Sequence, residues 1–388
     1  MDLELSDEQR LIVSTVRDFV RREIVPREAD LDPDADELPR AEFDQLVAKV
    51  KGMGLYCADV PEDLGGPGVD TLTFTLMSIE LSQHRAGLYA PCYGVFGGSG
   101  LAQLLEASDD QRERYLFPVL AGEKRSFFAL TEPSGGSDPA GAIQTTARRD
   151  GDDWILNGTK QFISGADRAD FGITFARTDR DKGRDGITCF IVDTEAPGFH
   201  VRRVIHTLRS ARYATEIQFE DLRVPSANVL GEVNGGFRIA RDRVARQRIP
   251  YSAGCIGVAT VAQEMAVEYA KQRSTFGAPL STRQAVQWML VDNEIDLRQA
   301  RWVTLDAAWK ADHSDNFIAA AAMAKVVATE AAGRVVDRAM QIHGGMGVAK
   351  ELPLERWYRE LRIRRIGEGP NEIQRMIIAR DLLRGPRS

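Results

Sequence analysis

The first third of the chain carries the apolar spacing of helices. From residue 6 onward apolar residues recur every three or four positions, and residues 6–9 have the form of a helix N-cap. The same spacing predicts helices over about 41–53 and 71–84, with a turn-rich loop at 61–68 between them. We therefore expect an N-terminal helical domain at 1–122.

The pattern changes near residue 125 to short runs that alternate or cluster as strands do, with Gly, Asp and Pro between them. The runs are 127–130, 154–160 (a hairpin strand with a turn in it), 171–176, 187–192 and 215–219. They predict a central β domain at 123–232. Helical spacing then returns in long alanine-rich and leucine-rich segments that suit a bundle. These helices are expected over about 236–273, 280–311 and 316–342, within a last domain at 233–388.

Composition and charge exclude several classes of protein. Hydrophobic residues make up 43% of the 388 residues and charged residues 28%, which are ordinary globular values. The net charge of −7 argues against a general nucleic-acid binder. The four cysteines are far apart and form no CxxC pair, which favours a reducing compartment. No run approaches the roughly 18 apolar residues of a membrane span. The acidic N-terminus lacks the apolar core of a signal peptide, so we expect a cytoplasmic protein.

A single carboxylate stands out near the end of the chain. Glu368 lies between Gly367 and Gly369, and the chain leaves it through Pro370 and Asn371, which suit the start of a helix. Such a joint can present one acidic side chain to a cleft, with backbone N–H groups nearby for a ligand. An ordinary loop with a surface glutamate is the alternative, and the local sequence leaves both open.

Other segments are candidates for ligand contact. The loop at 129–138 has two glycines and three hydroxyls after a strand, and Phe162 lies near Ser164 at the end of another strand. The run 341–347 ends a helix with three glycines in four positions, but it lacks the GxGxxG spacing of a Rossmann site. A plain loop, a core phenylalanine and a helix C-cap are the structural alternatives.

Two groups of arginines, at 241–248 and 356–365, suit either solvated ion pairs or phosphate binding. The sequence contains no HExxH, no GxSxG and no Walker motif. Zinc-protease, serine-hydrolase and P-loop chemistry are therefore not indicated.

Taken together, these segments resemble the acyl-CoA dehydrogenase family of flavoproteins over nearly the whole chain. The matching segments are 129–138, 271–277, 341–347 with Glu351, Arg356 and Glu360 after it, and 366–375. Four matches in the family's order, around a central β domain, make the resemblance specific.

The resemblance implies an α+β multidomain fold with an N-terminal helical bundle, a central antiparallel β domain and a C-terminal four-helix bundle. It also implies a homotetramer whose FAD is shared between neighbouring subunits. Carried over by position, the contacts to the flavin end are Phe128, Leu130, Thr131, Ser137, Phe162 and Ser164. The contacts to the adenosine and pyrophosphate end, from a neighbouring subunit, are Arg273, Phe276, Gln284, Gln341, Gly344 and Gly345.

The reaction implied is the α,β-dehydrogenation of an acyl-CoA thioester to a trans-2-enoyl-CoA. In the family a glutamate at the position of Glu368 removes the α-proton, and a hydride passes to flavin N5. The thioester oxygen is held by the backbone N–H of the base and by a flavin hydroxyl. Ser137, Arg248 and Gly369 are the matching substrate-binding positions. Electron-transferring flavoprotein is the implied electron acceptor.

The chain departs from the family pattern at a few positions. Pro370 and Glu372 replace the threonine and glutamine common after the base, so local FAD contacts can differ. Phe162 stands where many members have tryptophan. Gln247 occupies a position where some members carry their base, and a glutamine cannot remove a proton, which strengthens the case for Glu368.

The acyl pocket of the family is walled near residues 81–95. Here we expect Tyr89 and Tyr93, one helical turn apart, to shorten the cavity or to stack on a ring. This predicts a short, cyclic or aromatic acyl group. Arg85 could instead anchor a dicarboxylic, glutaryl-like acyl group, or it could face solvent or pair with an acid.

Three rival functions share these features. One is an acyl-CoA oxidase of the same fold, and another is a lyase-like or desulfinase-like relative that keeps FAD without net oxidation. The third is a catalytically silent flavin-binding or CoA-binding scaffold. The intact Glu368 disfavours the second, and the presence of both the base and the FAD segments disfavours the third.

Overall fold

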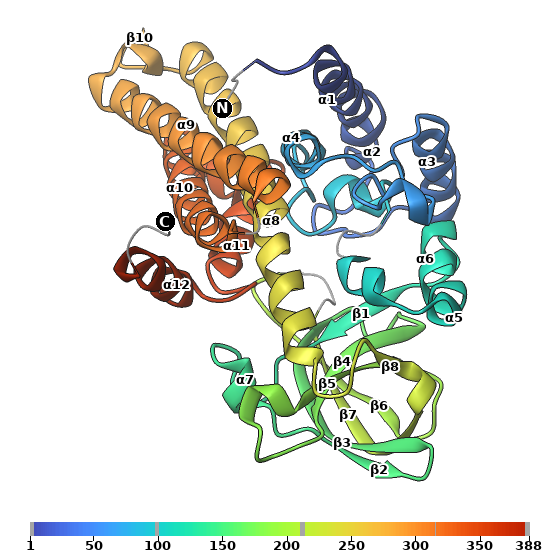
Figure 1. The fold of residues 1–388 in the computed structure, drawn as a ribbon. Helices are drawn as coiled ribbons and strands as arrows, with labels where there is room; N and C mark the ends of the chain where they lie inside the picture. Colours follow the sequence, from blue (N-terminus) through green and yellow to red (C-terminus); the bar gives the residue numbers. More distant parts are fainter. Residues whose placement is uncertain (1–3, 98–100, 210–213, 315, 385–388) are drawn as a thin grey trace. The chain divides into compact units, whose positions relative to one another are not determined.

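The computed structural model describes residues 4–97, 101–209, 214–314 and 316–384 (Figure 1). These residues form two compact units. One unit joins the two ends of the chain, Met1–Phe96 with Ala245–Ser388, and the other is Gly97–Val244. Among the described residues, no helix is both long enough and apolar enough to cross a membrane.

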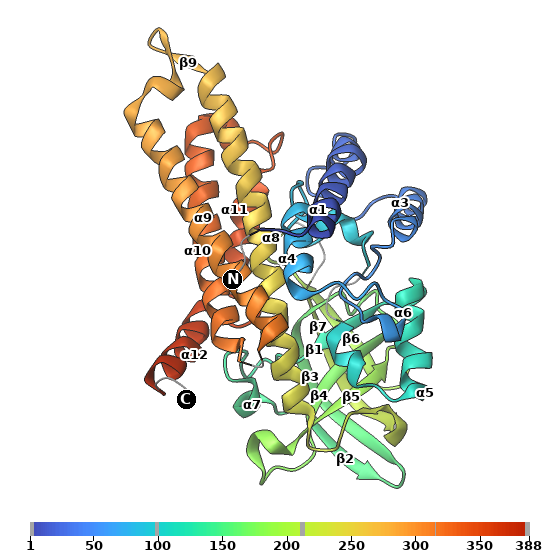
Figure 2. The same ribbon diagram turned by 45° about the horizontal axis from the view of Figure 1, so that its top comes forward.

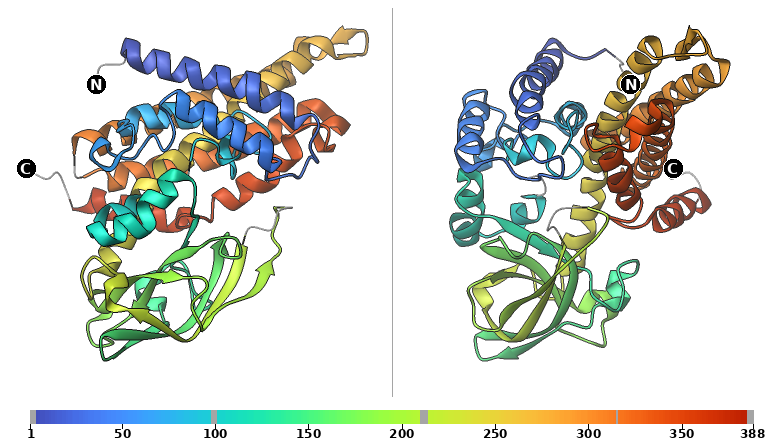
Figure 3. Two further views of the ribbon diagram at one scale, coloured as in Figure 1. Left: turned by 90° about the vertical axis from the view of Figure 1, so that its right-hand side faces the viewer. Right: turned by 180° about the vertical axis from the view of Figure 1, so that it is seen from behind.

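The unit Gly97–Val244 is built around one twisted sheet, coloured green to yellow-green in Figure 3. Its strands are β1 (Ser126–Ala129), β2 (Thr146–Asp150), β3 (Asp153–Ser164), β4 (Phe171–Arg177), β5 (Ile187–Asp193), β6 (Phe199–Ile205), β7 (Ala214–Pro225) and β8 (Val229–Leu230). They lie in the order β6-β7-β3-β2-β4-β5-β8, with β1 beside β4. The pairs are antiparallel, apart from β1 with β4 and a one-residue contact of β2 with β4. The predicted β domain is thus confirmed. It differs from a purely antiparallel sheet because β1 pairs with β4 in parallel.

One detail of the sheet differs from the prediction. The expected turn at Asn157 and Gly158 is a register shift inside the continuous strand β3. Gly158 has a φ of +155°, and a Cβ there would lie 2.3 Å from the Thr145 hydroxyl oxygen. A β-bulge and the close approach to Thr145 therefore require a glycine here. In the sequence, this glycine looks like the signal of a turn.

Short helices precede the strands in the same unit. These are α5 (Asp109–Gln111) and α6 (Phe117–Ala121), and α7 (Pro139–Ala142) follows β1. Gln111 anchors this segment, because its amide donates to the carbonyls of Ala227 and Val229 at 2.8 Å each. The predicted domain boundaries at 122/123 and 232/233 stay a prediction.

The other unit begins with four helices of the N-terminal part. They are α1 (Asp7–Phe19), α2 (Val25–Glu28), α3 (Arg40–Gly52) and α4 (Thr71–Leu81). The capping box that starts α1 is formed by Ser6 and Gln9, as its sequence predicts. Helix α4 ends three residues before the predicted 84, because the chain folds back on itself. A Cβ at Gly87 would lie 2.0 Å from the Ser82 carbonyl oxygen.

The C-terminal helices form the rest of this unit. They are α8 (Gly236–Gln272), which starts in the other unit, α9 (Gln284–His313), α10 (Ile318–His343), α11 (Leu354–Arg364) and α12 (Asn371–Leu383). Helices α8, α9 and α10 run side by side (Figures 1 and 2). Their shared core is rich in alanine, which lets helices approach closely. The first three of these helices match the predicted ranges, so the predicted order of helical, β and helical parts is confirmed.

Candidate active site

Glu368 lies in a short connection between α11 and α12, and its backbone is strained. Its φ is +54°, and that of Gly369 is +87°. A left-handed conformation is routine for glycine but costs about 1–2 kcal/mol for other residues. Such outliers persist where the surroundings hold them, and they are common at functional sites. We call Arg365–Asn371 the base loop.

Side chains from three helices hold the carbonyl oxygens of the base loop. Gln374 of α12 donates to Gly369 O at 2.9 Å and to Glu368 O at 3.4 Å. Arg248 of α8 donates to Glu368 O at 3.4 Å. Lys325 of α10 donates to Arg365 O at 3.1 Å and to Gly369 O at 3.0 Å. The backbone around the glutamate is therefore fixed through its carbonyl groups.

Arg248 is a buried cation beside the base loop. Its exposed fraction is 7%, and burial lowers its pKa to about 10 although the nearby Glu368 raises it. A guanidinium with this pKa remains charged at neutral pH. A buried charge needs compensation, and in this unit the carboxylate of Glu368 contributes it.

A stack of aromatic rings and a guanidinium lies next to the base loop. The Arg364 guanidinium is 3.9 Å from the ring centre of Tyr251 and 4.6 Å from that of Tyr89. Gly367 is needed beside this stack, since a Cβ there would lie 2.5 Å from the Tyr251 hydroxyl oxygen. Of the predicted pocket residues, Tyr89 is thus brought to the base loop. The sequence does not predict Tyr251 at this site, because the direction of its side chain is set by packing and not by a local motif.

Arg85 and Tyr93 have other partners. The two terminal nitrogens of Arg85 donate to Lys350 O at 2.7 Å and to Glu351 O at 2.9 Å. The Tyr93 hydroxyl donates to Glu28 at 3.0 Å. The expected helical turn from Tyr89 to Tyr93 is wrong, because the chain forms turns there and Tyr93 has a φ of +55°.

A buried polar network holds the segment around Tyr93. Glu28 lies 2.8 Å from His84 Nδ1, and the Cys92 N–H donates to His84 Nε2 at 2.7 Å. Nδ1 therefore faces Glu28 as the donor, because Nε2 accepts the Cys92 N–H. Burial would raise the pKa of Glu28, but His84 and the N–H groups of Arg85 and Ala86 hold it below its usual value. The charged carboxylate of Glu28 thus holds the segment around Tyr93 in place.

The predicted flavin-end residues lie on neighbouring segments of the other unit. Phe128, Leu130 and Thr131 follow along and after β1, and Phe162 and Ser164 end β3. The two segments are joined by the Gln161 N–H, which donates to Thr131 O at 2.9 Å. Ser137 is exposed in the loop after Thr131.

Phe162 combines a positive φ of +58° with a side chain that is 56% exposed. The sequence leaves open that Phe162 is a core residue. A large aromatic ring that is exposed in this way is not part of the core. Together with the hydroxyls of Thr131, Ser137 and Ser164, it offers a flat apolar face and polar edges. These residues fit the flavin end of FAD.

A buried ion pair lies under the flavin-end segments. Lys160 Nζ is 2.7 Å from Glu132 Oε1 and 2.6 Å from Phe175 O, and Lys160 is fully buried. Glu132 also accepts from the N–H groups of Gln144 and Thr145. The pair joins the start of the loop at 130–138 to β3.

The predicted nucleotide-end residues gather at one end of the helical bundle. Arg273 and Phe276 lie on the small hairpin of β9 (Ser274–Thr275) and β10 (Ala278–Pro279), and Gln284 opens α9. Gln341, Gly344 and Gly345 end α10. The two groups are joined by the stacked rings of Tyr269 and His343, 4.5 Å apart.

This end of the bundle suits a flat ligand with a phosphate. Phe276 is 99% exposed with a φ of +50°, and Arg273, directly before β9, is also exposed. Gly344 has a φ of +59°, and a Cβ at Gly344 or Gly345 would meet no other atom within 4 Å. Backbone N–H groups without side chains, an arginine and an aromatic ring fit the nucleotide end of FAD.

Several of the clustered arginines have protein partners. Arg356 pairs with Asp36 and Glu360, and Arg359 pairs with Glu355. Arg243 lies over the ring of Phe128, 4.3 Å from its centre. The sequence leaves these arginines open to ion pairing or to phosphate binding. In the structure, several of them form ion pairs or ring contacts within the protein.

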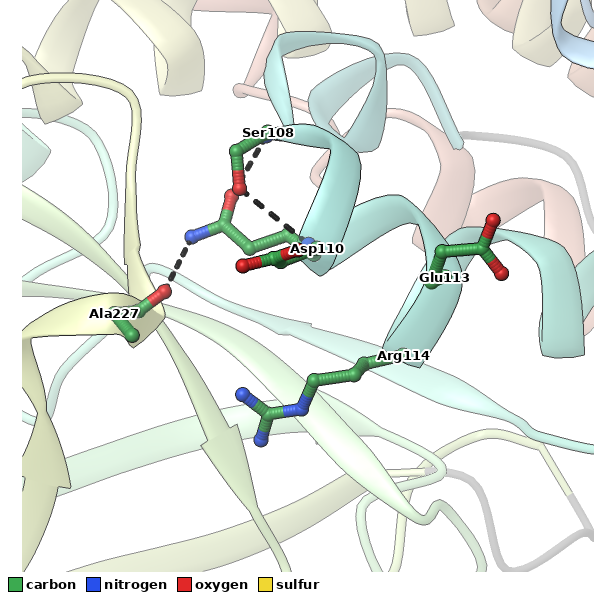
Figure 4. Close-up of a pocket in the computed structure, with 6 residues that line it drawn as sticks. Ser108, Asp110, Glu113, Arg114 and Ala227 are labelled. Carbon is green, nitrogen blue, oxygen red and sulfur yellow. Dashed lines mark hydrogen bonds between the residues drawn. The ribbon is translucent and has the colours of Figure 1, made fainter.

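A pocket elsewhere in the β-containing unit contains none of the predicted site residues (Figure 4). It is lined by Ser108, Asp110, Gln111, Glu113, Arg114 and Ala227. Its acidic and basic side chains come from exposed helix positions. Among the residues that the structure describes, no group of His, Cys, Asp and Glu side chains could hold a metal ion.

Comparison with known proteins identifies the family. Residues 6–123, 127–222 and 234–383 match the N-terminal, middle and C-terminal domains of acyl-CoA dehydrogenase. The chain belongs to the acyl-CoA dehydrogenase family. The predicted enzyme class, an acyl-CoA dehydrogenase-type oxidoreductase, and the predicted cofactor, FAD, are thereby confirmed.

Curated relatives of this acyl-CoA dehydrogenase family member match it along its whole length. Human mitochondrial short-chain specific acyl-CoA dehydrogenase is 40% identical, over 100% of this chain and 92% of the relative. The 3-(aryl)acrylate reductase of Clostridium sporogenes is 39% identical, over 98% and 99% of the two chains.

Solved structures agree with this assignment. Butyryl-CoA dehydrogenase from Megasphaera elsdenii superimposes with a TM-score of 0.88 and 34% identity, covering 99% of this chain and 100% of that one. The FAD complex of PigA has a TM-score of 0.88 and 29% identity, covering 99% and 100%.

We expect the purified protein to be yellow and to carry about one FAD per chain, because both ends of the cofactor have matching residues. Replacing Arg273 by Ala should weaken FAD binding, since a guanidinium is lost from the nucleotide end. The measurement is FAD released from denatured protein, per chain, with dissociation constants from reconstitution.

Lys271→Ala is the matched control, because Lys271 is an exposed neighbour that pairs with Glu268 at 2.7 Å. Equal FAD affinity in the two variants would count against Arg273 as a contact. A colourless protein that takes up no FAD would contradict the residue assignment altogether.

Proposed function

We propose that this chain catalyses the α,β-dehydrogenation of an acyl-CoA thioester to a trans-2-enoyl-CoA, with Glu368 as the base. The observation that carries the proposal is the strained, left-handed backbone of Glu368, held through its carbonyl groups by Gln374, Arg248 and Lys325. A surface glutamate in an ordinary loop has no need of such a backbone.

The residues of the base loop perform the first half of the reaction. The Glu368 carboxylate removes the α-proton, and a rigid backbone keeps its oxygens in line with that proton. The backbone N–H of Glu368 donates to the thioester oxygen, so that negative charge developing there is stabilised. FAD, when bound, supplies the acceptor for the β-hydride.

The remaining site residues position the substrate and the cofactor. Arg248, charged at neutral pH and bonded to the Glu368 carbonyl, is proposed to bind the CoA thioester, with Ser137 and Gly369 as further substrate contacts. The flavin-end and nucleotide-end residues hold the two ends of FAD. The nucleotide-end residues are proposed to reach the FAD of a neighbouring subunit in a homotetramer, as the family resemblance implies.

The acyl group is proposed to be short, cyclic or aromatic. Tyr89 lies against Arg364 of the base-loop stack, where its ring would close the far side of an acyl pocket. Two relatives at about the same identity act, by name, as a short-chain specific dehydrogenase and as an aryl-acrylate reductase. The glutaryl-like alternative is less supported, because Arg85 already donates to two backbone carbonyls.

A panel of thioesters tests the substrate. We expect kcat/KM to be highest for butyryl-CoA or for a cyclic or aryl acyl-CoA, and lower for glutaryl-CoA and palmitoyl-CoA, because Tyr89 shortens the pocket. Arg85→Ala should leave the ranking of these thioesters by kcat/KM unchanged, even if the variant is less stable. Best turnover on palmitoyl-CoA would contradict the pocket, and selective loss of glutaryl-CoA turnover in Arg85→Ala would restore the dicarboxylic alternative.

The same assays separate the rival reactions. Flavin reduction without oxygen, followed by turnover with an artificial electron acceptor, supports a dehydrogenase, and repeating the assay with electron-transferring flavoprotein tests that protein as the electron acceptor. Fast turnover with oxygen alone would indicate an acyl-CoA oxidase. Product formation without net oxidation would indicate a lyase-like or desulfinase-like relative.

A further inference from the structure

Lys325 is a fully buried lysine that faces neutral oxygens. It lies near the start of α10, and no carboxylate of the described residues forms an ion pair with it. Lysine is almost never fully buried unless it is paired. Its ammonium instead donates to Arg365 O at 3.1 Å, Gly369 O at 3.0 Å and the Asn371 side-chain oxygen at 2.7 Å. Such an expensive arrangement needs an explanation.

The three acceptors lie on both sides of Glu368. Arg365 precedes the glutamate by three residues, Gly369 follows it directly, and Asn371 opens α12. An ammonium has three donors on one atom, and all three are used here. One side chain therefore bridges the end of α11, the residue after the glutamate and the start of α12.

The third acceptor is itself held in place. The Asn371 amide donates to Thr329 Oγ1 at 3.1 Å and to Glu330 at 3.0 Å, and Asn371 is 2% exposed. Thr329 in turn donates to Lys325 O at 2.8 Å. These bonds return to α10, so the base loop is fastened to one rigid helix by a closed set of hydrogen bonds.

We infer that Lys325 is a positioning residue for proton removal, which fastens the base loop so that the Glu368 carboxylate meets the α-proton. The inference rests on the proposed function, in which Glu368 is the base. The left-handed backbone at Glu368 needs surroundings that hold it, and Lys325 grips it from both sides. Arginine would not replace it, because a planar guanidinium spreads its donors over a fork.

The charge state agrees with this role. Burial lowers the pKa of Lys325 to about 8, with Arg248 lowering it further and Glu368, Glu372 and Cys255 raising it. The ammonium therefore predominates at neutral pH, and all three donors are present.

The test isolates proton removal from hydride transfer. The holoenzyme is mixed with 3,3-dimethylbutyryl-CoA, whose β-carbon carries no hydrogen, in D2O, and exchange of the α-protons is followed by NMR. Lys325→Met, similar in length and neutral, should slow exchange by about 10–100-fold, because small misplacements of a base have effects of this size. The dissociation constant of the thioester and the FAD content should stay within about twofold.

Arg334→Met is the matched control, because it removes a cation of the same helix that pairs with Asp296 away from the base loop. We expect its exchange rate to equal that of the wild type. A folded Lys325→Met that exchanges at the wild-type rate, or a loss shared equally by Arg334→Met, would overturn the inference.

Two further variants keep the result interpretable. If Lys325→Met does not fold, Asn371→Ala keeps Lys325 and its two backbone acceptors but removes the third acceptor together with its bonds to Thr329 and Glu330, and it should slow exchange in the same direction by a smaller factor. Unchanged exchange in a folded Asn371→Ala would then count against the inference. Glu368→Gln distinguishes a failure of this inference from a failure of the proposed function. If the α-protons still exchange in Glu368→Gln, then Glu368 is not the base, whatever the role of Lys325.

Discussion

Replacing Glu368 by Gln lowers the rate of flavin reduction by acyl-CoA by at least ~10²-fold, the lower range for loss of a positioned general base. The amide has nearly the shape of the carboxylate but cannot accept the α-proton. Gln374, Arg248 and Lys325 hold the base loop through its backbone carbonyls, and glutamine keeps the shape of the side chain, so the variant should fold and keep FAD. Rapid mixing without oxygen gives the rate, and titration with substrate gives the affinity.

Glu372→Gln is the matched control, because Glu372 is an exposed acid four residues further on, in the first turn of α12. It should reduce its flavin at the wild-type rate. A Glu368→Gln protein that keeps the wild-type rate would show that another group is the base. A large loss in Glu372→Gln alone would move that role to α12.

Replacing Lys160 by Met destabilises the β-containing unit by about 3–5 kcal/mol, the usual result of removing one partner of a buried ion pair. Lys160 is fully buried and Glu132 is 4% exposed, so the remaining carboxylate would be left without its cation. Burial lowers the pKa of Lys160, while Glu132 raises it. Chemical unfolding followed by a probe within this unit, such as Trp154 fluorescence, measures the change.

Two variants test the physical reason for that loss. Adding Glu132→Gln to Lys160→Met should recover part of the stability, because no buried charge then remains unpaired. Arg223→Met breaks exposed ion pairs with Asp150 and Asp153, and it should leave the stability nearly unchanged, because exposed pairs are screened by solvent. If Lys160→Met is no less stable than Arg223→Met, the buried pair does not hold this unit together.

The long elements and the base could be predicted because their signals are local. The helices predicted over 236–273, 280–311 and 316–342 match α8, α9 and α10, since an apolar face repeats along each of them. Glu368 was found because two glycines flank it, and glycines mark an unusual backbone before any partner is known.

The residues that hold the site could not be predicted, because their partners are distant in sequence. Lys325 stands among alanines, and only the return of the chain 40 residues later at Arg365 shows what it grips. Arg85 suggested a pocket wall by its position, whereas its acceptors lie at Lys350 and Glu351. Tyr93 was placed on a helix that the close approach at Gly87 prevents.

The left-handed backbone of Glu368 sets stability against activity at one position. A glycine there would relieve a conformational cost of about 1–2 kcal/mol, yet it would remove the carboxylate on which the proposed reaction depends. Selection for a more robust fold alone would therefore favour losing the base. Engineering for thermal tolerance should accordingly draw its substitutions from elsewhere in the molecule, and leave this residue as the place where the protein accepts a weaker fold in exchange for chemistry.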